Sequence, residues 1–333
     1  MSDALVFVTG STGFIGSHVV AAILKAGYRV RLSIRRAEQE ATLRQYFPEF
    51  NDKIETCIVS DITQRDSFHE ALQGVDYVFH IASPMPGKGT DFQNDYIDPA
   101  VNGTESILYA ALEFPQIKKV VIESSILALV PPASGFSSSE ISVKDNTGEI
   151  IPVDTNMTMP EGSAGHWLKY ASSKILAHQA TRAFLQNNKP HYALITFHPA
   201  FVLGDSMIQK TAQDIDAING FFWESLESRK PNIPTAWVHV RDVADAHVKA
   251  LETEIESGTE FLLATPVVSW EYVGNYVKSK YPTVHWKLEP PFGSWTVDVS
   301  TADRILRLKW RSQEQIVDDV INQQLALRAK ASI

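Results

Sequence analysis

Short apolar runs rich in β-branched and aromatic residues alternate with segments of helical periodicity over residues 4–200. This alternation indicates a parallel sheet with helices on both faces, the doubly wound α/β class. Ligands of such sheets bind at the carboxyl ends of the strands. The predicted strands are 4–9, 28–34, 54–59, 76–81, 118–123 and 191–197. The predicted helices are 17–24, 37–46, 66–72, 95–113 and 167–186.

The pattern is less regular elsewhere. Residues 131–165 are rich in serine, proline, glycine and asparagine, which predicts a long loop, and such loops are usually functional or mobile. Segments 237–240 and 260–264 are expected to return to the main sheet, and 312–328 to form a final helix. We therefore predict a Rossmann-type domain over 1–204 plus 236–265, and a smaller C-terminal substrate lobe over 205–235 plus 266–333.

Three glycines follow the first predicted strand and precede the first predicted helix. Gly10, Gly13 and Gly16 are spaced three and three, in the strand–turn–helix context that a phosphate-binding motif requires. The first permits a tight turn, the second lets the backbone approach a pyrophosphate, and the third allows close helix packing. Amides at the helix N-terminus then bind the phosphates. The alternative is a glycine turn without a ligand, and the flanking strand and helix favour dinucleotide binding.

The second predicted strand ends at Arg35 and Arg36. In this fold that end faces the adenosine ribose, where an acidic residue binds the 2′-hydroxyl of NAD and arginine accommodates the 2′-phosphate of NADP. No acidic residue occupies positions 31–37, and guanidinium groups bind phosphate through paired hydrogen bonds. The alternative is two solvated surface arginines. We expect NADP(H), with Arg35 the stronger candidate for direct contact.

Tyr170 and Lys174 stand four residues apart in a predicted helix. That spacing puts a phenol and an ammonium on one helix face. A nearby positive charge favours the phenolate and lowers the tyrosine pKa from its usual value of ~10. The pair therefore predicts a tyrosine that serves as acid or base. A chance pairing on an amphipathic helix is the alternative, and the dinucleotide motif favours the catalytic interpretation.

Composition narrows the classes of function. A formal net charge of −9 over 333 residues argues against nucleic acid or an anionic membrane as the main partner. The single cysteine, Cys57, cannot form an internal disulfide and fits a reducing compartment. The ten histidines show no paired metal-ligand spacing, so no metal site is expected. No signal segment or apolar run of membrane-spanning length is found, and we expect a cytoplasmic protein.

Taken in order, these motifs resemble the extended short-chain dehydrogenase/reductase family over nearly the whole length. The nearest branch is the dihydroflavonol reductase, cinnamoyl-CoA reductase and yeast methylglyoxal reductase-like group. The resemblance rests on the glycine motif, His80-Ile81-Ala82-Ser83, the pair Ser124-Ser125, Tyr170-x-x-x-Lys174, and the run from Trp237 to His247.

The resemblance implies a role for particular positions. The catalytic residues would be Ser125, Tyr170 and Lys174, with Ser125 preferred to Ser124 as the last of its serine run. Tyr170 and Lys174 would also bind the cofactor, as would Gly10, Thr12, Gly13, Phe14 and Ile15 along the pyrophosphate, Arg35 and Arg36 at the 2′-phosphate, Asp61 and Ile62 beside the adenine, Ala82 and Ser83 after the fourth strand, and Pro199 and Val202 at the nicotinamide.

Some positions depart from the family pattern, and others are explained by a structural role. Glu123 stands where this branch usually carries threonine, which changes the charge of the site if it points inward. An asparagine is the fourth catalytic residue of many short-chain reductases, and Asn102 is its candidate here. His80 and the region of Asp242 and His247 are interpreted as structural. Five aromatic residues are candidates for an apolar substrate pocket, although such residues more often serve packing: Phe136, Trp167, Phe221, Phe222 and Trp223.

We therefore expect an NADPH-dependent reductase of aldehydes or ketones, in which tyrosine donates the proton. Its partner would be a small carbonyl compound of apolar or aromatic character, and the protein a monomer or homodimer. A nucleotide-sugar epimerase or dehydratase is one alternative, and the arginine pair argues against it. A non-catalytic NADPH sensor is another, and it would have no need of a proton donor.

Overall fold

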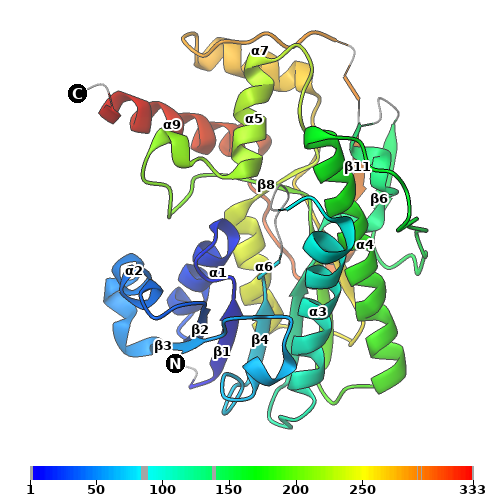
Figure 1. The fold of residues 1–333 in the computed structure, drawn as a ribbon. Coiled ribbons are helices and arrows are strands. Elements are labelled where there is room, and N and C mark those ends of the chain that lie inside the picture. Colours follow the sequence, from blue (N-terminus) through cyan, green and yellow to red (C-terminus); the bar gives the residue numbers. More distant parts are fainter. Residues whose placement is uncertain (1–2, 84–88, 137–139, 291, 294, 332–333) are drawn as a thin grey trace.

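Seven parallel strands form the central sheet of the computed structural model, which describes residues 3–83, 89–136, 140–290, 292–293 and 295–331 (Figure 1). Their spatial order is β10-β7-β5-β4-β1-β2-β3. Their bounds are β1 (Leu5–Thr9), β2 (Arg29–Ile34), β3 (Ile54–Ile58), β4 (Tyr77–His80), β5 (Lys119–Glu123), β7 (Ala193–Pro199) and β10 (Glu260–Leu263). The order reverses between β1 and β4, which creates the crevice where ligands of this fold bind. The predicted doubly wound α/β fold is confirmed.

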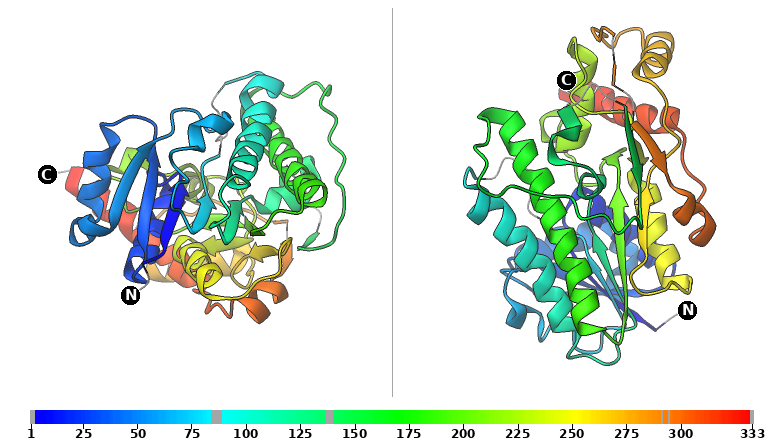
Figure 2. Two further views of the ribbon diagram at one scale, coloured as in Figure 1. Left: turned by 90° about the horizontal axis from the view of Figure 1, so that it is seen from below. Right: turned by 90° about the vertical axis from the view of Figure 1, so that its right-hand side faces the viewer.

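Helices cover both faces of the sheet because its strands are apolar on both sides. Along β1, Val6 and Val8 belong to one buried cluster, whereas Leu5 and Phe7 belong to the other. Helices α1 (Phe14–Lys25) and α6 (Val240–Glu252) pack together, as do α3 (Asp98–Ala111) and α4 (Gly162–Asn188) (Figures 1 and 2). A shorter helix, α2 (Gln39–Tyr46), follows β2.

Two small sheets and four further helices complete the described structure. Strand β6 (Ile141–Lys144) pairs with β11 (Trp295–Asp298), and β8 (Phe201–Leu203) pairs with β9 (Trp237–His239). The helices are α5 (Ala217–Glu227), α7 (Trp270–Lys280), α8 (Ser300–Ile305) and α9 (Gln313–Ala331). In Figure 1, α5, α7 and α9 lie at the opposite end of the molecule from the chain start. The division into a Rossmann domain and a smaller lobe stays a prediction.

Aromatic packing joins α5, β9 and α7. Phe222 of α5 lies with its ring centroid 5.4 Å from that of Trp237, and Trp237 lies 5.2 Å from Trp270 of α7. All three side chains are fully buried. They therefore hold β9 between the two helices, and α9 packs on the same strand.

Three expectations about elements are wrong. Residues 237–240 do not join the main sheet, because β10 already pairs with β7 at that edge and β9 pairs with β8 instead. The expected loop 131–165 contains β6, whose partner β11 lies far away in the sequence. The expected helix 66–72 is only a 3-10 turn at Arg65–Phe68. Among the described residues, no helix is both long and apolar enough to cross a bilayer.

Candidate active site

The glycine turn after β1 is packed against the end of β4. Gly10 has φ +73°, in the region that favours glycine, and a Cβ there would lie 2.8 Å from the amide nitrogen of Ala82. A Cβ at Gly16 would overlap the carbonyl oxygen of Gly10. Both positions therefore require glycine, since a side chain would push the turn away from β4 or from α1.

The N-terminus of α1 is suited to an anion. Gly13 is its N-cap; within the described structure no side chain caps this end, and its first turn carries no acidic residue. Thr12 is exposed at the turn, Phe14 is buried, and Ile15 is half-buried. The open amides and the positive end of the helix dipole therefore fit the pyrophosphate of a dinucleotide.

Arg35 and Arg36 lie directly after β2, and both are exposed. Their backbone amides donate hydrogen bonds to Oε1 of Gln39, at 2.8 and 3.2 Å. These bonds fix the backbone and leave both guanidinium groups facing solvent. The arrangement fits a 2′-phosphate held by one or two arginines.

Two more predicted cofactor contacts follow β3. Asp61 is exposed, and its carboxylate accepts hydrogen bonds from the amide and hydroxyl of Thr63, at 2.9 and 2.7 Å. These bonds, with a smaller contribution from the charge of Arg35, lower the pKa of Asp61. Ile62 is half-buried and points toward Gly103 of α3, where an added Cβ would lie 3.3 Å from its Cδ1.

The remaining predicted contacts are distributed along the carboxyl edge of the sheet. Ala82 and Ser83 are half-buried just after β4, and the amide of Ala82 donates to the hydroxyl of Thr9 at 3.1 Å. Pro199 is buried at the end of β7, and Val202 is buried in β8. That these four residues contact the cofactor stays a prediction.

The three predicted catalytic residues meet between β5 and α4. Ser125 lies two residues after the end of β5, and its hydroxyl is close enough to hydrogen-bond to the phenol of Tyr170. Its Oγ also accepts the amide of Leu127 at 3.2 Å. On α4, Nζ of Lys174 lies 5.7 Å from the ring centroid of Tyr170. The structure therefore brings the hydroxyl, the phenol and the amine together.

The pKa of Tyr170 differs from expectation. The sequence predicts that Lys174 lowers it, yet it is raised well above its ordinary value. Burial of the phenolate is the main cause, followed by the negative charge of Glu123, and the hydrogen bond from Ser125 only partly offsets them. The phenol is therefore protonated at neutral pH.

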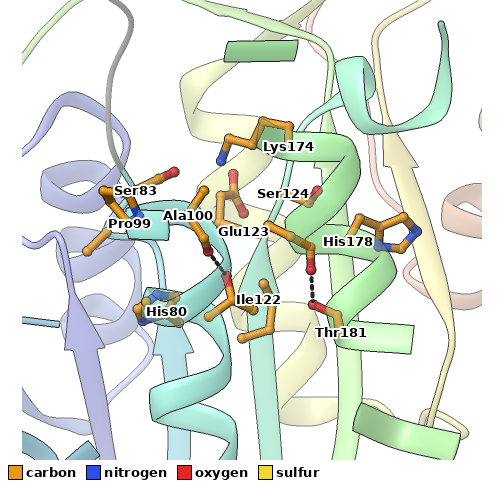
Figure 3. A pocket seen from close by; sticks show the side chains of 14 residues that line it. His80, Ser83, Pro99, Ala100, Ile122, Glu123, Ser124, Lys174, His178 and Thr181 are labelled. Carbon is orange, nitrogen blue, oxygen red and sulfur yellow. Dashed lines mark hydrogen bonds between the residues drawn. The ribbon is translucent and has the colours of Figure 1, made fainter. Parts of the chain in front are cut away.

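Lys174 itself is buried, which lowers its pKa to about 8 against the opposing influence of Glu123. It lines a cavity of ≈ 20 Å³ that reaches from α4 to the end of β4 (Figure 3). Ala82, Ser83 and Glu123 line the same cavity. Lys174 thus lies close to the segment that the glycine turn contacts.

The structure places three further titratable residues beside the site, and the sequence did not predict that they belong there. His80 and His178 line the cavity, and His247 lies 3.5 Å from Oε2 of Glu123. His80 and His247 come from the family motifs interpreted as structural, and the periodicity of the sequence gave no sign that His80 lines the cavity or that His247 approaches Glu123. Asn102, the candidate fourth residue, is exposed on α3 and does not line this cavity.

Aromatic residues gather beside Tyr170. The ring centroid of Trp167 lies 6.1 Å from Tyr170, 5.4 Å from Phe221 and 6.0 Å from Phe201. Trp167 and Phe221 are only partly buried. These rings provide an apolar surface next to the phenol.

The other aromatic candidates differ. Phe222 is fully buried in the core described above, so the prediction that it lines a substrate pocket is wrong. Trp223 is also buried, with the guanidinium of Arg328 at 4.5 Å from its ring centroid. Successive helical residues point in different directions, which is why one residue of the run reaches Trp167 and its neighbours do not. The side chain of Phe136 lies outside the described residues.

One buried cluster has metal-ligating side chains that sequence spacing did not reveal. His178, His198 and Glu260 bring their ligand atoms within 4.8 Å of one another. However, both carboxyl oxygens of Glu260 accept hydrogen bonds from Arg182, at 2.6 and 2.8 Å. That guanidinium neutralises the carboxylate and would repel a cation, so the cluster does not suit a metal ion.

Comparison with known proteins agrees with this geometry. The family model described as "NAD dependent epimerase/dehydratase family" matches residues 6–264. The chain belongs to this family. A ketoreductase of Aspergillus fumigatus, sphI, is 36% identical over 98% of each chain. A ketoreductase of Aspergillus niger, azaE, is 29% identical over 96% of this chain and 97% of the relative. The resemblance to extended short-chain dehydrogenases/reductases is thereby confirmed.

Solved structures show the same fold over the whole chain. Gre2 from Candida albicans, crystallised with NADPH, has a TM-score of 0.81 at 26% identity and covers 97% of this chain and 99% of its own. The yeast methylglyoxal/isovaleraldehyde reductase Gre2, also complexed with NADPH, has a TM-score of 0.82 at 24% identity, with coverage of 98% and 99%. At this identity the second match supports the fold alone.

Proposed function

We propose that the protein reduces a ketone or aldehyde to the alcohol with NADPH, and that Tyr170 donates the proton. The observation that carries this proposal is the meeting of Ser125, Tyr170 and Lys174 at the carboxyl edge of the sheet, near the glycine turn. The chain is an NADP(H)-dependent oxidoreductase. Bound NADPH supplies the hydride, and the protein orients the substrate and handles the proton.

Each catalytic side chain has a distinct task in this proposal. The hydroxyl of Ser125 donates a hydrogen bond to the carbonyl oxygen and stabilises the negative charge that develops there. The phenol of Tyr170, held in its protonated form, gives its proton to the same oxygen. The ammonium of Lys174 stabilises the resulting phenolate and binds the nicotinamide ribose.

The geometry of the loops supports a role in cofactor binding for two segments, the glycine turn and the end of β2. Gly10, Gly13 and the first turn of α1 hold the pyrophosphate through backbone amides. Arg35 binds the 2′-phosphate, and its exposure leaves the guanidinium free to do so.

The substrate is a carbonyl compound with an apolar or aromatic body. Trp167 is a partly buried ring next to Tyr170, and the partly buried Phe221 packs on Trp167, so a substrate bound there would place its apolar body against these rings. The relatives sphI and azaE are named ketoreductases, which supports a ketone as the reacting group.

An epimerase or dehydratase of nucleotide sugars is the second candidate, since the matched family carries that description. Such enzymes recycle a tightly held NAD, whereas the exposed Arg35 and Arg36 replace the acidic residue that NAD would favour. A non-catalytic NADPH sensor is the third candidate, and it would not need the serine, tyrosine and lysine that meet in the site.

The test uses purified protein, NADPH and a panel of aldehydes, ketones and β-keto esters. We expect loss of NADPH absorbance in step with formation of an alcohol, and little reaction when NADH replaces NADPH. Consumption of a nucleotide sugar without net NADPH oxidation would identify an epimerase. Binding of NADPH with no substrate in the panel reduced would contradict the proposal.

A further inference from the structure

Glu123 is a buried acid that sits where three catalytic elements meet. It is the last residue of β5, two residues before Ser125, and is 7% exposed. Among the described residues, neither carboxyl oxygen has a hydrogen-bond partner. Burying a polar group without partners costs about 2–7 kcal/mol, so a native protein retains such a group for a ligand, a water molecule or a chemical role.

The carboxyl of Glu123 faces the amine of Lys174 inside the cavity (Figure 3). Within the described structure the two groups form no direct ion pair, yet the charge of each affects the pKa of the other. The cavity of ≈ 20 Å³ has room for one water molecule. Ser83 and His80 line it as well, so a water there has enough polar neighbours to be held firmly.

His247 of α6 also approaches Glu123. Its Nδ1 lies 2.9 Å from the carbonyl oxygen of Val243, which makes Nδ1 the donor and leaves Nε2, 3.5 Å from Glu123, without a proton. Burial lowers the pKa of His247 to about 4, so the ring is neutral at neutral pH. It therefore supplies no charge that would hold Glu123 ionised.

His80 of β4 is neutral for the same reason. The hydroxyl of Thr9 accepts from the amides of Ile81 and Ala82 and so donates its own proton to Nδ1 of His80, 3.1 Å away. Burial and the charge of Lys174 lower the pKa of His80 to about 3. His178, which also lines the cavity, approaches Glu260 at 3.2 Å instead.

Tyr170 and Lys174, both on α4, are the remaining titratable groups whose charges couple to Glu123. Among these groups Lys174 is the cation, because the buried rings of His80 and His247 are neutral. The charge of Lys174 therefore depends on the protonation of Glu123, and the reverse holds as well.

We propose that Glu123 is a positioning residue of the reaction centre that exchanges a proton with Lys174 through one water molecule, and so sets the alkaline limit of the reaction. In the exchange the O–H bond of the carboxylic acid breaks, the water accepts that proton and passes one on, and an N–H bond forms on Lys174. No electron moves and no further reactant is needed. The inference rests on the proposed function in assigning Lys174 to catalysis.

The direction in which Glu123 shifts the pH dependence of the reaction follows from its interaction with Lys174. Burial raises the pKa of Glu123 to about 8 and lowers that of Lys174 to about 8, so both titrate in the same range. An ionised Glu123 favours the ammonium and keeps it to higher pH. In Glu123→Gln that support is absent, and Lys174 loses its proton at lower pH.

The first measurement reads the protonation of Glu123 without any turnover. We expect the infrared spectrum of the wild-type protein to show a carboxylic acid band at neutral pH that disappears as the pH rises past about 8. The band should be missing in Glu123→Gln and present in the control Asp145→Asn, which neutralises another buried acid. A spectrum identical in wild type and Glu123→Gln would overturn the inference, whether or not any carbonyl compound is reduced.

The second measurement compares the pH profiles of kcat. The alkaline limb is the fall of kcat at high pH. For Glu123→Gln we expect this fall to begin on the order of one pH unit lower than in the wild type, with KM for NADPH little changed at pH 6 to 7. Asp145→Asn, whose carboxylate binds the amide of Leu262 and the hydroxyl of Thr301, should lower the melting temperature without moving the limb. Equal limbs in wild type and Glu123→Gln would overturn the inference. A wild-type protein that reduces no substrate would instead refute the proposed function, and the infrared result would still stand.

Discussion

At the scale of single residues, burial decides how the side chains proposed to be catalytic behave. Tyr170 and Lys174 are neighbours on α4, but the pKa of Tyr170 is governed by its loss of contact with water and by Glu123. The spacing of four residues correctly predicted that they share a face. It could not predict the sign of the pKa shift, because the burial of the phenol and the approach of Glu123, 47 positions earlier in β5, arise only in the folded chain.

Arg35 provides the residue-scale test of cofactor choice. We expect Arg35→Glu to raise the Kd for NADPH by about 10–100-fold, because a charge-assisted hydrogen bond to the 2′-phosphate is lost and a like charge is introduced. The Kd for NADH, which has no 2′-phosphate, should change far less. Both can be measured by fluorescence titration.

The control for that measurement is Arg229→Glu, a charge reversal at another exposed arginine. It should leave both affinities as they are in the wild type. Equal weakening of NADPH and NADH by Arg35→Glu would remove the case for recognition of the 2′-phosphate.

At the scale of elements, the sequence predicted those structures that depend on residues close together in the chain. The strand, glycine turn and helix over residues 5–25 could be predicted because the turn needs Gly10 at positive φ and Gly16 against the backbone. The partner of a short strand could not be predicted in this way, since β6 pairs with β11 across more than 150 residues and β9 pairs with β8. For the same reason the sequence did not reveal that His247 faces Glu123.

Gly16 tests whether α1 must pack this closely. We expect Gly16→Ala to destabilise the protein by about 1–3 kcal/mol, because the added methyl group overlaps the carbonyl oxygen of Gly10. Displacement of the turn should also weaken NADPH binding. Urea denaturation gives the free energy of unfolding, and fluorescence titration gives the affinity.

A matched substitution separates this effect from the general loss of a glycine. Gly220 lies inside α5, where an added Cβ would meet only Cγ2 of Ile215 at 3.6 Å. Gly220→Ala should leave stability unchanged or raise it by about 0.5–1 kcal/mol, since alanine favours the helix. If both variants behaved alike, the close packing at Gly16 would not matter.

At the scale of the whole molecule, several ionisable groups are kept neutral in the interior. His80, His239 and His247 have pKa values lowered to between about 3 and about 4, chiefly by burial. Glu123 has its pKa raised to about 8. Stability must therefore depend on pH well above the range in which ordinary carboxylates titrate.

The sign of that dependence can be stated. In the unfolded chain the histidines bind protons below pH ~6.5, whereas the folded protein excludes them, so acid favours unfolding. Glu123 acts in the opposite direction, but one carboxyl does not outweigh three histidines. We expect the free energy of unfolding in urea to fall as the pH is lowered from about 6.5 to about 4.5.

His247→Asn should reduce the slope of that fall, because asparagine can keep the hydrogen bond to Val243 but cannot titrate. His69→Asn, at an exposed position, should leave the slope as it is in the wild type. A free energy of unfolding independent of pH over this range would show that the buried histidines do not contribute in this way.

The most direct test of the central claim is the comparison of turnover and NADPH affinity in Tyr170→Phe. This variant keeps the ring beside Trp167 and removes only the phenolic hydroxyl. We predict that kcat falls by about 10²–10⁴-fold, the usual contribution of a positioned general acid, while the Kd for NADPH stays at its wild-type value. Turnover at the wild-type rate would contradict the account.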